Sequence, residues 1–183
     1  GGEFDHATGE AAASNLFVVV REGALLDVSG TSAVLDLPGQ GATPVASHAG
    51  SISLASSNGL YLEGTLQANA GGEGAAGGSL TVALDTPFYR TNSAGERVRQ
   101  VRELVLSQVK GENQLAAGST AAEAADGLTY GHARVGVDQI EAGGFDNLTL
   151  ASDGLLSFDR DTSLSLGQSL SLYSRVLGLT GTA

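Results

Sequence analysis

The sequence predicts an all-β protein built as a parallel β-helix, a solenoid in which coils of short strands stack on one another. Three observations lead to this prediction. Apolar and polar residues alternate over most of the chain, imperfect repeats of roughly 20–25 residues run along it, and glycine is abundant, with 27 copies against three prolines. Short half-buried strands joined by tight turns account for all three.

The alternation defines the expected strands. No long segment repeats its apolar residues with the period of a helix, whereas several short ones repeat them with a period of two, which is typical of strands with one buried face. In chain order these segments are SISLAS (51–56), LYLEGTL (60–66), SLTVALD (79–85), RVGVDQI (134–140), NLTLAS (147–152) and SLSLGQSLSLYS (163–174).

The recurring phrases predict how the strands stack. VVVREGALLDVSG (18–30) is similar to LYLEGTLQANAGG (60–72), and SISLASSNGLYLEG (51–64) aligns with NLTLASDGLLSFDR (147–160) after one gap. Leucine-rich repeats have a similar length, but their pattern L-x-x-L-x-L-x-x-N is not sustained in this chain. With a spacing of about 4.8 Å between coils, about six coils give a rod near 30 Å long. An antiparallel β-sandwich is the alternative, because it also needs short alternating strands.

Residues 85–134 interrupt the pattern within this single β-helix segment of residues 1–183. Five of the nine basic residues lie within residues 90–110 of this region: Arg90, Arg97, Arg99, Arg102 and Lys110. Thr120 and Glu123 have the spacing of a capping box, which predicts a short helix in GSTAAEAADG (118–127). We expect an irregular excursion of loops and a short helix that projects from the shaft and flanks one strand pair.

A glycine-rich loop at 71–78 contains the spacing G-x-G-x-x-G at Gly72, Gly74 and Gly77, which is the fingerprint of dinucleotide binding. That fingerprint must open a helix whose N-terminus meets the phosphate. Here an alternating segment follows instead, which predicts a strand. We therefore expect a tight turn between coils and no nucleotide.

Charge and composition exclude several classes of function. The formal net charge of −11 disfavours nucleic acid, whose binding depends on Lys and Arg. The chain has no cysteine, and its three histidines lie far apart, so no metal or cofactor is expected. Asp159 and Asp161 share one expected strand face, and His132 is a further candidate, which leaves a glycan-cleaving β-helix enzyme of the pectin-lyase-like type as an alternative. The expectation is that the chain is not an enzyme.

Two long stretches resemble filamentous haemagglutinin-family exoproteins, which are two-partner secretion proteins of Gram-negative bacteria. They are GSISLASSNGLYLEGTLQANAGGEGAAGGSLTVALDTP (50–87) with the later RELVLSQ, and GVDQIEAGGFDNLTLASDGLLSFD (136–159) with SLSLGQSLSLYS. The resemblance covers most of residues 15–177. It implies a right-handed, single-stranded parallel β-helix that an outer-membrane transporter exports to the bacterial cell surface or medium. Members act as adhesins or as stalks that carry a toxin.

The family's N-terminal secretion domain and a toxin domain are not visible, so the resemblance implies an internal shaft segment that mediates cell attachment or presents other domains. A host-cell or neighbouring-cell surface glycan or protein is the expected partner of such a segment. We expect any contact to use the irregular region, because recognition concentrates in loops on a rigid scaffold. The candidate residues for acidic glycans or a neighbouring shaft segment are Phe88, Tyr89, Arg90, Arg97, Arg99 and Arg102. The alternative is a solvated loop without a ligand.

Overall fold

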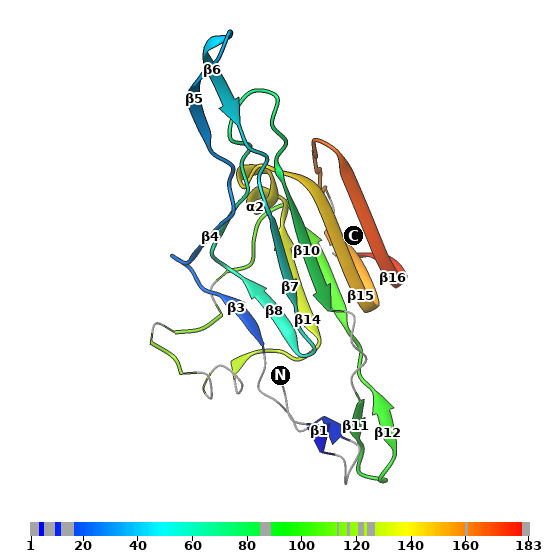
Figure 1. The fold of residues 1–183 in the computed structure, drawn as a ribbon. Coiled ribbons are helices and arrows are strands. Elements are labelled where there is room, and N and C mark those ends of the chain that lie inside the picture. Colours follow the sequence, from blue (N-terminus) through cyan, green and yellow to red (C-terminus); the bar gives the residue numbers. More distant parts are fainter. Residues whose placement is uncertain are drawn as a thin grey trace.

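The protein is mostly β-strand, at 53%, and its largest element is a parallel sheet (Figure 1). The computed structural model describes residues 4–5, 10–11, 17–84, 89–112, 114–116, 118–120, 123, 127–159 and 161–180. For β1 (Phe4–Asp5) and β2 (Glu10–Ala11), which form an antiparallel pair, only the backbone is described. All-β, as predicted from the alternation, is therefore confirmed as the class of the fold.

The large sheet has eight strands in the order β3-β8-β14-β13-β15-β10-β7, with β16 also paired to β15. The bounds of these strands are β3 (Val18–Val20), β7 (Ser51–Ala55), β8 (Gly59–Leu62), β10 (Gly78–Leu84), β13 (Glu103–Ser107), β14 (His132–Gly136), β15 (Phe145–Asp159) and β16 (Ser169–Thr180). Every pair in this sheet is parallel. An antiparallel sandwich is therefore wrong for this chain.

Strand β15 divides the sheet into two rows. Its first part pairs with β10 and its second part with β13, and the register of its pairing with β16 shifts between Ser152 and Leu155. The long row consists of β3, β8, β14, β13 and the second parts of β15 and β16. The short row consists of β7, β10 and the first parts of β15 and β16.

Three further pairs of strands complete the β structure. Strands β4 (Leu25–Asp27) and β9 (Thr65–Gln67) pair in parallel beside the large sheet. Two antiparallel hairpins, β5 (Ser32–Leu37) with β6 (Gly41–Ala46) and β11 (Tyr89–Thr91) with β12 (Arg97–Arg99), project from opposite ends of the large strands (Figure 1).

The phrases that recur in the sequence occupy equivalent positions in space, as direct neighbours for the first pair and in shared rows for the second. Val18 is the partner of Leu60, and Leu25 is the partner of Thr65, so residues 18–30 lie along residues 60–72 as their similarity indicates. In the short row, Ile52, Leu80, Leu148 and Leu170 occupy successive positions of one column. The similarity in sequence therefore reflects equivalent positions in the sheet.

One core lies between the two rows. Leu148 and Leu150 of the short row are fully buried, as is Leu156 of the long row, and they belong to the same apolar cluster. Thr149, between the two buried leucines, is partly exposed, so the alternating pattern predicted the inward face correctly. Full burial of each leucine contributes roughly 1.5–3 kcal/mol.

One predicted strand is wrong in its second part. RVGVDQI ends its strand at Gly136, and helix α2 (Val137–Ala142) follows. Val137 and Ile140 are three residues apart and both fully buried, which suits one face of a helix. Gln139 directs its side-chain amide to the carbonyl of Gly64 at 2.7 Å, a contact between distant residues that a local pattern does not show.

The irregular region 85–134 contributes two strands to the long row. After β10 the chain makes the β11–β12 hairpin, enters the row as β13, leaves it through residues 108–131, and returns as β14 between β8 and β13. The capping box is present: the Thr120 N–H donates to Glu123 Oε2 at 2.7 Å, and the Glu123 N–H donates to Thr120 Oγ1 at 3.4 Å. The remainder of the predicted helix lies largely outside the described residues.

Candidate functional site

Four of the six residues predicted as a contact surface lie on the β11–β12 hairpin: Tyr89, Arg90, Arg97 and Arg99. Its turn is closed by Asn92, whose side-chain oxygen accepts the N–H groups of Ala94 and Glu96. The Arg97 guanidinium lies over the Tyr89 ring at 5.1 Å, and that of Arg90 lies over the Tyr130 ring at 4.8 Å. Both geometries are those of cation–π contacts.

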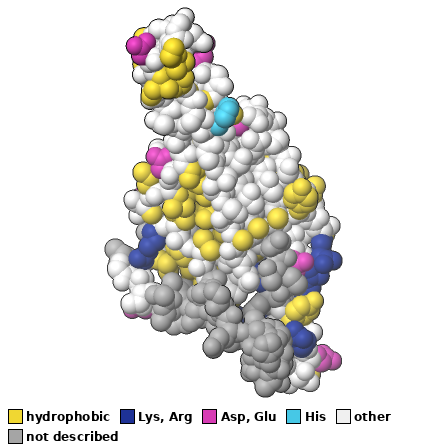
Figure 2. Space-filling model, viewed as in Figure 1, with side chains coloured by type: hydrophobic (Ala, Val, Ile, Leu, Met, Phe, Trp, Pro, Cys, Tyr) yellow, Lys and Arg dark blue, Asp and Glu magenta, His cyan; other side chains and the backbone are white. Residues whose placement is uncertain are grey.

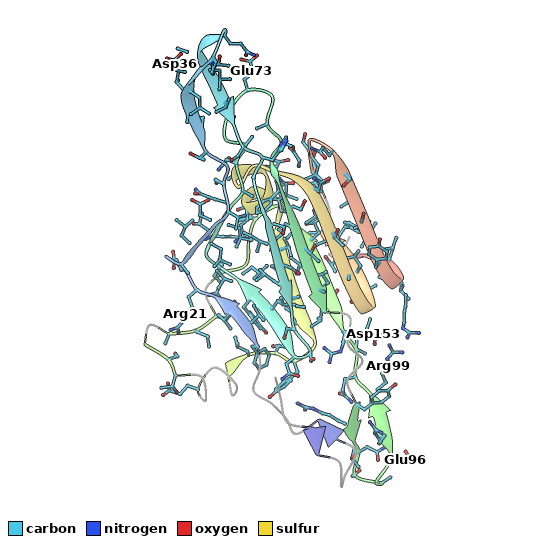
Figure 3. The ribbon with its side chains drawn as sticks, in the orientation of Figure 1. Arg21, Asp36, Glu73, Glu96, Arg99 and Asp153 are labelled. Atoms are coloured by element: carbon cyan, nitrogen blue, oxygen red, sulfur yellow. The ribbon has the colours of Figure 1, made fainter. Side chains whose placement is uncertain are left out.

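Arg99 faces the sheet. Its guanidinium forms an ion pair with Asp153, at the bend of β15, and donates to the Asp153 carbonyl at 3.0 Å (Figure 3). Arg175 of β16 donates to the other carboxylate oxygen at 3.3 Å. Burial opposes the charge on Asp153, but the hydrogen bonds and charges of the two arginines outweigh it, so its pKa lies below the ordinary value.

The six predicted contact residues do not form one exposed surface. Tyr89, Arg90 and Arg97 are exposed, whereas Arg102 is only 1% exposed and lies inside the molecule. Burial lowers the pKa of the Arg102 guanidinium, while Asp153 raises it. Arg102 directly precedes β13, whose side chains alternate between the inward and outward faces. The burial of Arg102 therefore comes from its place beside the sheet and not from the character of its own segment. Phe88 lies outside the described residues.

A groove on the outer face of the long row was not predicted. Four neighbouring strands form its floor, through Tyr61 of β8, Arg134 of β14, Ser107 of β13 and Asp159 of β15. The segment after β13 forms its wall. The groove has a volume of about 790 Å³, and its other lining residues are Leu60, Leu62, Glu63, Gln108, Val109, Lys110, Gly111, Glu112, Gln114, Thr129 and His132.

Hydrogen bonds fix the wall of the groove to its floor. The Lys110 ammonium donates to the Glu63 carbonyl at 2.6 Å, and the Gln114 N–H donates to Glu63 Oε1 at 2.8 Å. The Tyr61 hydroxyl donates to the Thr129 carbonyl at 2.9 Å and accepts the Thr129 N–H at 2.7 Å. These contacts join residues 47 to 68 positions apart, so no local spacing in the sequence indicates the groove.

The charges in the groove are mixed. Arg134 donates to Asp159 Oδ2 at 3.1 Å, and the other Asp159 oxygen is hydrogen-bonded by the Thr180 hydroxyl. Burial lowers the pKa of His132, while Glu103 raises it and Arg134 lowers it further, so His132 is neutral at pH 7. Burial raises the pKa of the Tyr61 hydroxyl, which stays protonated.

The glycine-rich loop joins β9 to β10, and no helix follows it. The dinucleotide fingerprint therefore lacks the helix N-terminus that holds a pyrophosphate. Gly74 has a φ of 77°, which suits a tight turn. Gly77 has a different role: a Cβ there would approach the Gly144 carbonyl oxygen to 2.2 Å, so the turn packs against a neighbouring turn.

Asp159 and Asp161, the two carboxylates on which the alternative enzyme prediction rests, do not lie on one strand. Asp159 is the last residue of β15, whereas Asp161 lies in a turn with a φ of 63°. Within the described ranges, no group of three or more His, Asp or Glu side chains could hold a metal ion. No helix in that part of the chain is long and apolar enough to span a membrane.

Comparison with protein-family models, curated proteins and solved structures finds no match to this chain.

Proposed function

We propose that the chain is a right-handed, single-stranded parallel β-helix that serves as a structural shaft segment of a secreted bacterial surface adhesin. The stacked parallel rows carry this proposal. Successive passes of the chain return to the same two rows with an in-register column of inward leucines, as stacked coils do. The rows supply six strand positions on one side and four on the other.

The last strand supports a role as one part of a longer stack. Along β16, Leu170 continues the column of Leu148, and Leu179 continues that of Phe158, yet Leu179 is 77% exposed. Such leucines are the side chains that a further coil covers. An exposed strand edge with apolar side chains favours the addition of another strand.

The outer face of the short row favours a shaft over an enzyme. Its side chains are uncharged and, Tyr173 apart, small, and two polar columns run across the strands: Ser51, Ser79, Asn147 and Ser169 in one, and Ser53, Thr81, Thr149 and Ser171 in the other. Charged side chains are few on the face shown in Figure 2. A glycan-cleaving enzyme needs a pair of carboxylates across its substrate, and these columns offer none.

The segment mediates attachment to a host or neighbouring cell, or presents other domains, and the full-length protein is exported by an outer-membrane transporter. The resemblance to filamentous haemagglutinin-family exoproteins supports both statements. Antibodies against this chain are expected to label unpermeabilised cells of the source bacterium. Labelling only after permeabilisation would contradict a place at the cell surface.

Deletion of one complete coil tests the β-helix itself. Leu156 and Leu177 are partners 21 residues apart, so removal of residues 156–176 joins Leu155 to Leu177 and brings the second part of β16 onto the neighbours of β15 with the same register. We expect this variant to remain folded and to melt cooperatively. The matched control, removal of the 11 residues 148–158, shifts every inward residue and should unfold the chain. Circular dichroism melts that show both deletions unfolded, or both folded, would contradict stacked coils.

A further inference from the structure

Stacked coils alone do not create the groove under the segment that follows β13. The groove therefore indicates a function beyond that of a shaft. Its volume of about 790 Å³ lies in the range of ligand sites. Four neighbouring strands form its floor, so it extends over three strand spacings, about 14 Å. This length suits a chain of linked units better than a single small molecule.

Backbone pairing in the groove is complete. Strands β8, β14, β13 and β15 each pair with a neighbour on both sides, so no strand edge in the floor is open to an extended peptide. Addition of a peptide strand, which depends on main-chain hydrogen bonds, is therefore excluded at this floor. A ligand there must be recognised by side chains.

The side chains of the groove combine donors with acceptors and carry little net charge. Lys110 and Arg134 are cations, whereas Glu63, Glu112 and Asp159 are carboxylates. Arg134 and Asp159 largely neutralise one another at 3.1 Å. With a formal charge of −11 on the whole chain, an anionic ligand is disfavoured. Hydroxyl groups, which both donate and accept, match such a surface.

One buried carboxylate oxygen in the groove has no hydrogen-bond partner among the described residues. Glu63 lines the groove and is 2% exposed; its Oε1 accepts the Gln114 N–H, but its Oε2 has no hydrogen-bond partner among the described residues. A buried carboxylate oxygen without a donor is costly, so such groups mark sites where a donor is missing. Glu63 lines the groove, so the groove is where a ligand hydroxyl would supply that donor.

We propose that this groove binds an uncharged oligosaccharide, with Arg134, Asp159, Lys110 and Glu63 as hydrogen-bonding partners of its hydroxyl groups. The pair Arg134–Asp159 provides a donor and an acceptor on the floor, and it is partly exposed on both sides, at 37% and 33%. The wall supplies Lys110. The site is separate from the basic β11–β12 hairpin, which was predicted to contact acidic glycans.

Titration calorimetry on the full chain tests this inference, with maltohexaose, cellohexaose and xylohexaose as neutral probes, and with hexagalacturonate and a hexalysine peptide as charged ones. We expect saturable binding of at least one neutral probe and weaker binding of both charged ones. The double variant Arg134→Gln/Asp159→Asn removes both charges, keeps polar side chains at both positions and should weaken that binding at least tenfold. Arg97→Gln, on the hairpin, is the matched control and should leave it unchanged.

Three results would overturn the inference. The first is no saturable heat with any neutral probe. The second is equal affinity of the double variant and the unaltered protein, with circular dichroism showing both folded. The third is preferential binding of hexalysine or hexagalacturonate, which would assign the groove to a charged peptide or an acidic glycan.

Discussion

Arg99 of β12 and Asp153 at the bend of β15 form an ion pair that joins the projecting hairpin to the large sheet. Arg175 of β16 binds the same carboxylate, so one acidic residue connects three elements. Asp153 lies where the chain passes from the short row to the long row. The hairpin is therefore attached at a structural corner, and its outer strand residues remain exposed.

Loss of this ion pair should loosen the hairpin without unfolding the protein. In Arg99→Ser, amide exchange over residues 89–99 is expected to become faster, while the free energy of unfolding changes little, because ion pairs near the surface contribute little to stability. Arg97→Ser, which removes a contact with Tyr89 only, is the control. Equal exchange in the two variants would show that Asp153 does not hold the hairpin.

A charge in the column of inward leucines should be far more damaging than one beside it. Leu150 is fully buried and Thr149 is partly exposed. Leu150→Asp buries a carboxylate without a partner, which costs enough to unfold a marginally stable domain, whereas Thr149→Asp should lower the melting temperature only slightly. Leu150→Ala, a milder change, should cost about 2–5 kcal/mol. Similar melting curves for the two Asp variants would contradict the register.

Two glycines of the nucleotide-like fingerprint should differ in their tolerance of a methyl group. A Cβ at Gly77 would lie 2.2 Å from the Gly144 carbonyl oxygen, whereas one at Gly72 would lie 3.1 Å from the Ala46 side chain. Gly77→Ala must move backbone and should destabilise the protein clearly; Gly72→Ala should be mild. Thermal melts compare the two. Saturable binding of NAD, FAD or ATP that is lost in Gly74→Val would instead restore the cofactor interpretation.

Acidification should destabilise the protein in a window set by His132. Its pKa is lowered in the folded state from the ordinary 6.5, chiefly by burial. Above 6.5 the residue is neutral in both states; below it the unfolded chain takes up the proton first, so stability falls until the folded pKa is passed. Denaturant melts across this range should show the fall, and His132→Gln should abolish it. An unchanged fall in the variant would assign it to other groups.

Binding of the segment to acidic glycans should depend on the exposed arginines of the hairpin. If the predicted contact surface exists, the Arg90→Ser/Arg97→Ser variant elutes from immobilised heparin at lower salt than the unaltered protein, because fewer cations pair with sulfate. Lys110→Ser, in the groove, is the control for a loss of net charge alone. Identical elution of all three proteins would leave the hairpin without this role.

The sequence by itself determined which residues face inward and which segments are equivalent. The period of two places Leu148 and Leu150 on one face whatever the partners of the strand are, because side chains of a strand alternate. The likeness of residues 18–30 to residues 60–72 likewise predicted their stacking, since equivalent coils bury the same positions. The leucines of Glu103–Ser107 alternate in the same way, although we predicted an irregular region there.

The tertiary structure alone decided how the interrupted region enters the sheet, where α2 replaces a strand, and which cations remain at the surface. The order β8-β14-β13-β15 reverses two strands, and nothing local in either strand states which neighbour it takes. The groove depends on this order, since Tyr61, Arg134 and Asp159 meet only when their strands become neighbours. Arg102 is buried for the same reason: long-range packing, rather than the character of a side chain in its own segment, fixes its exposure.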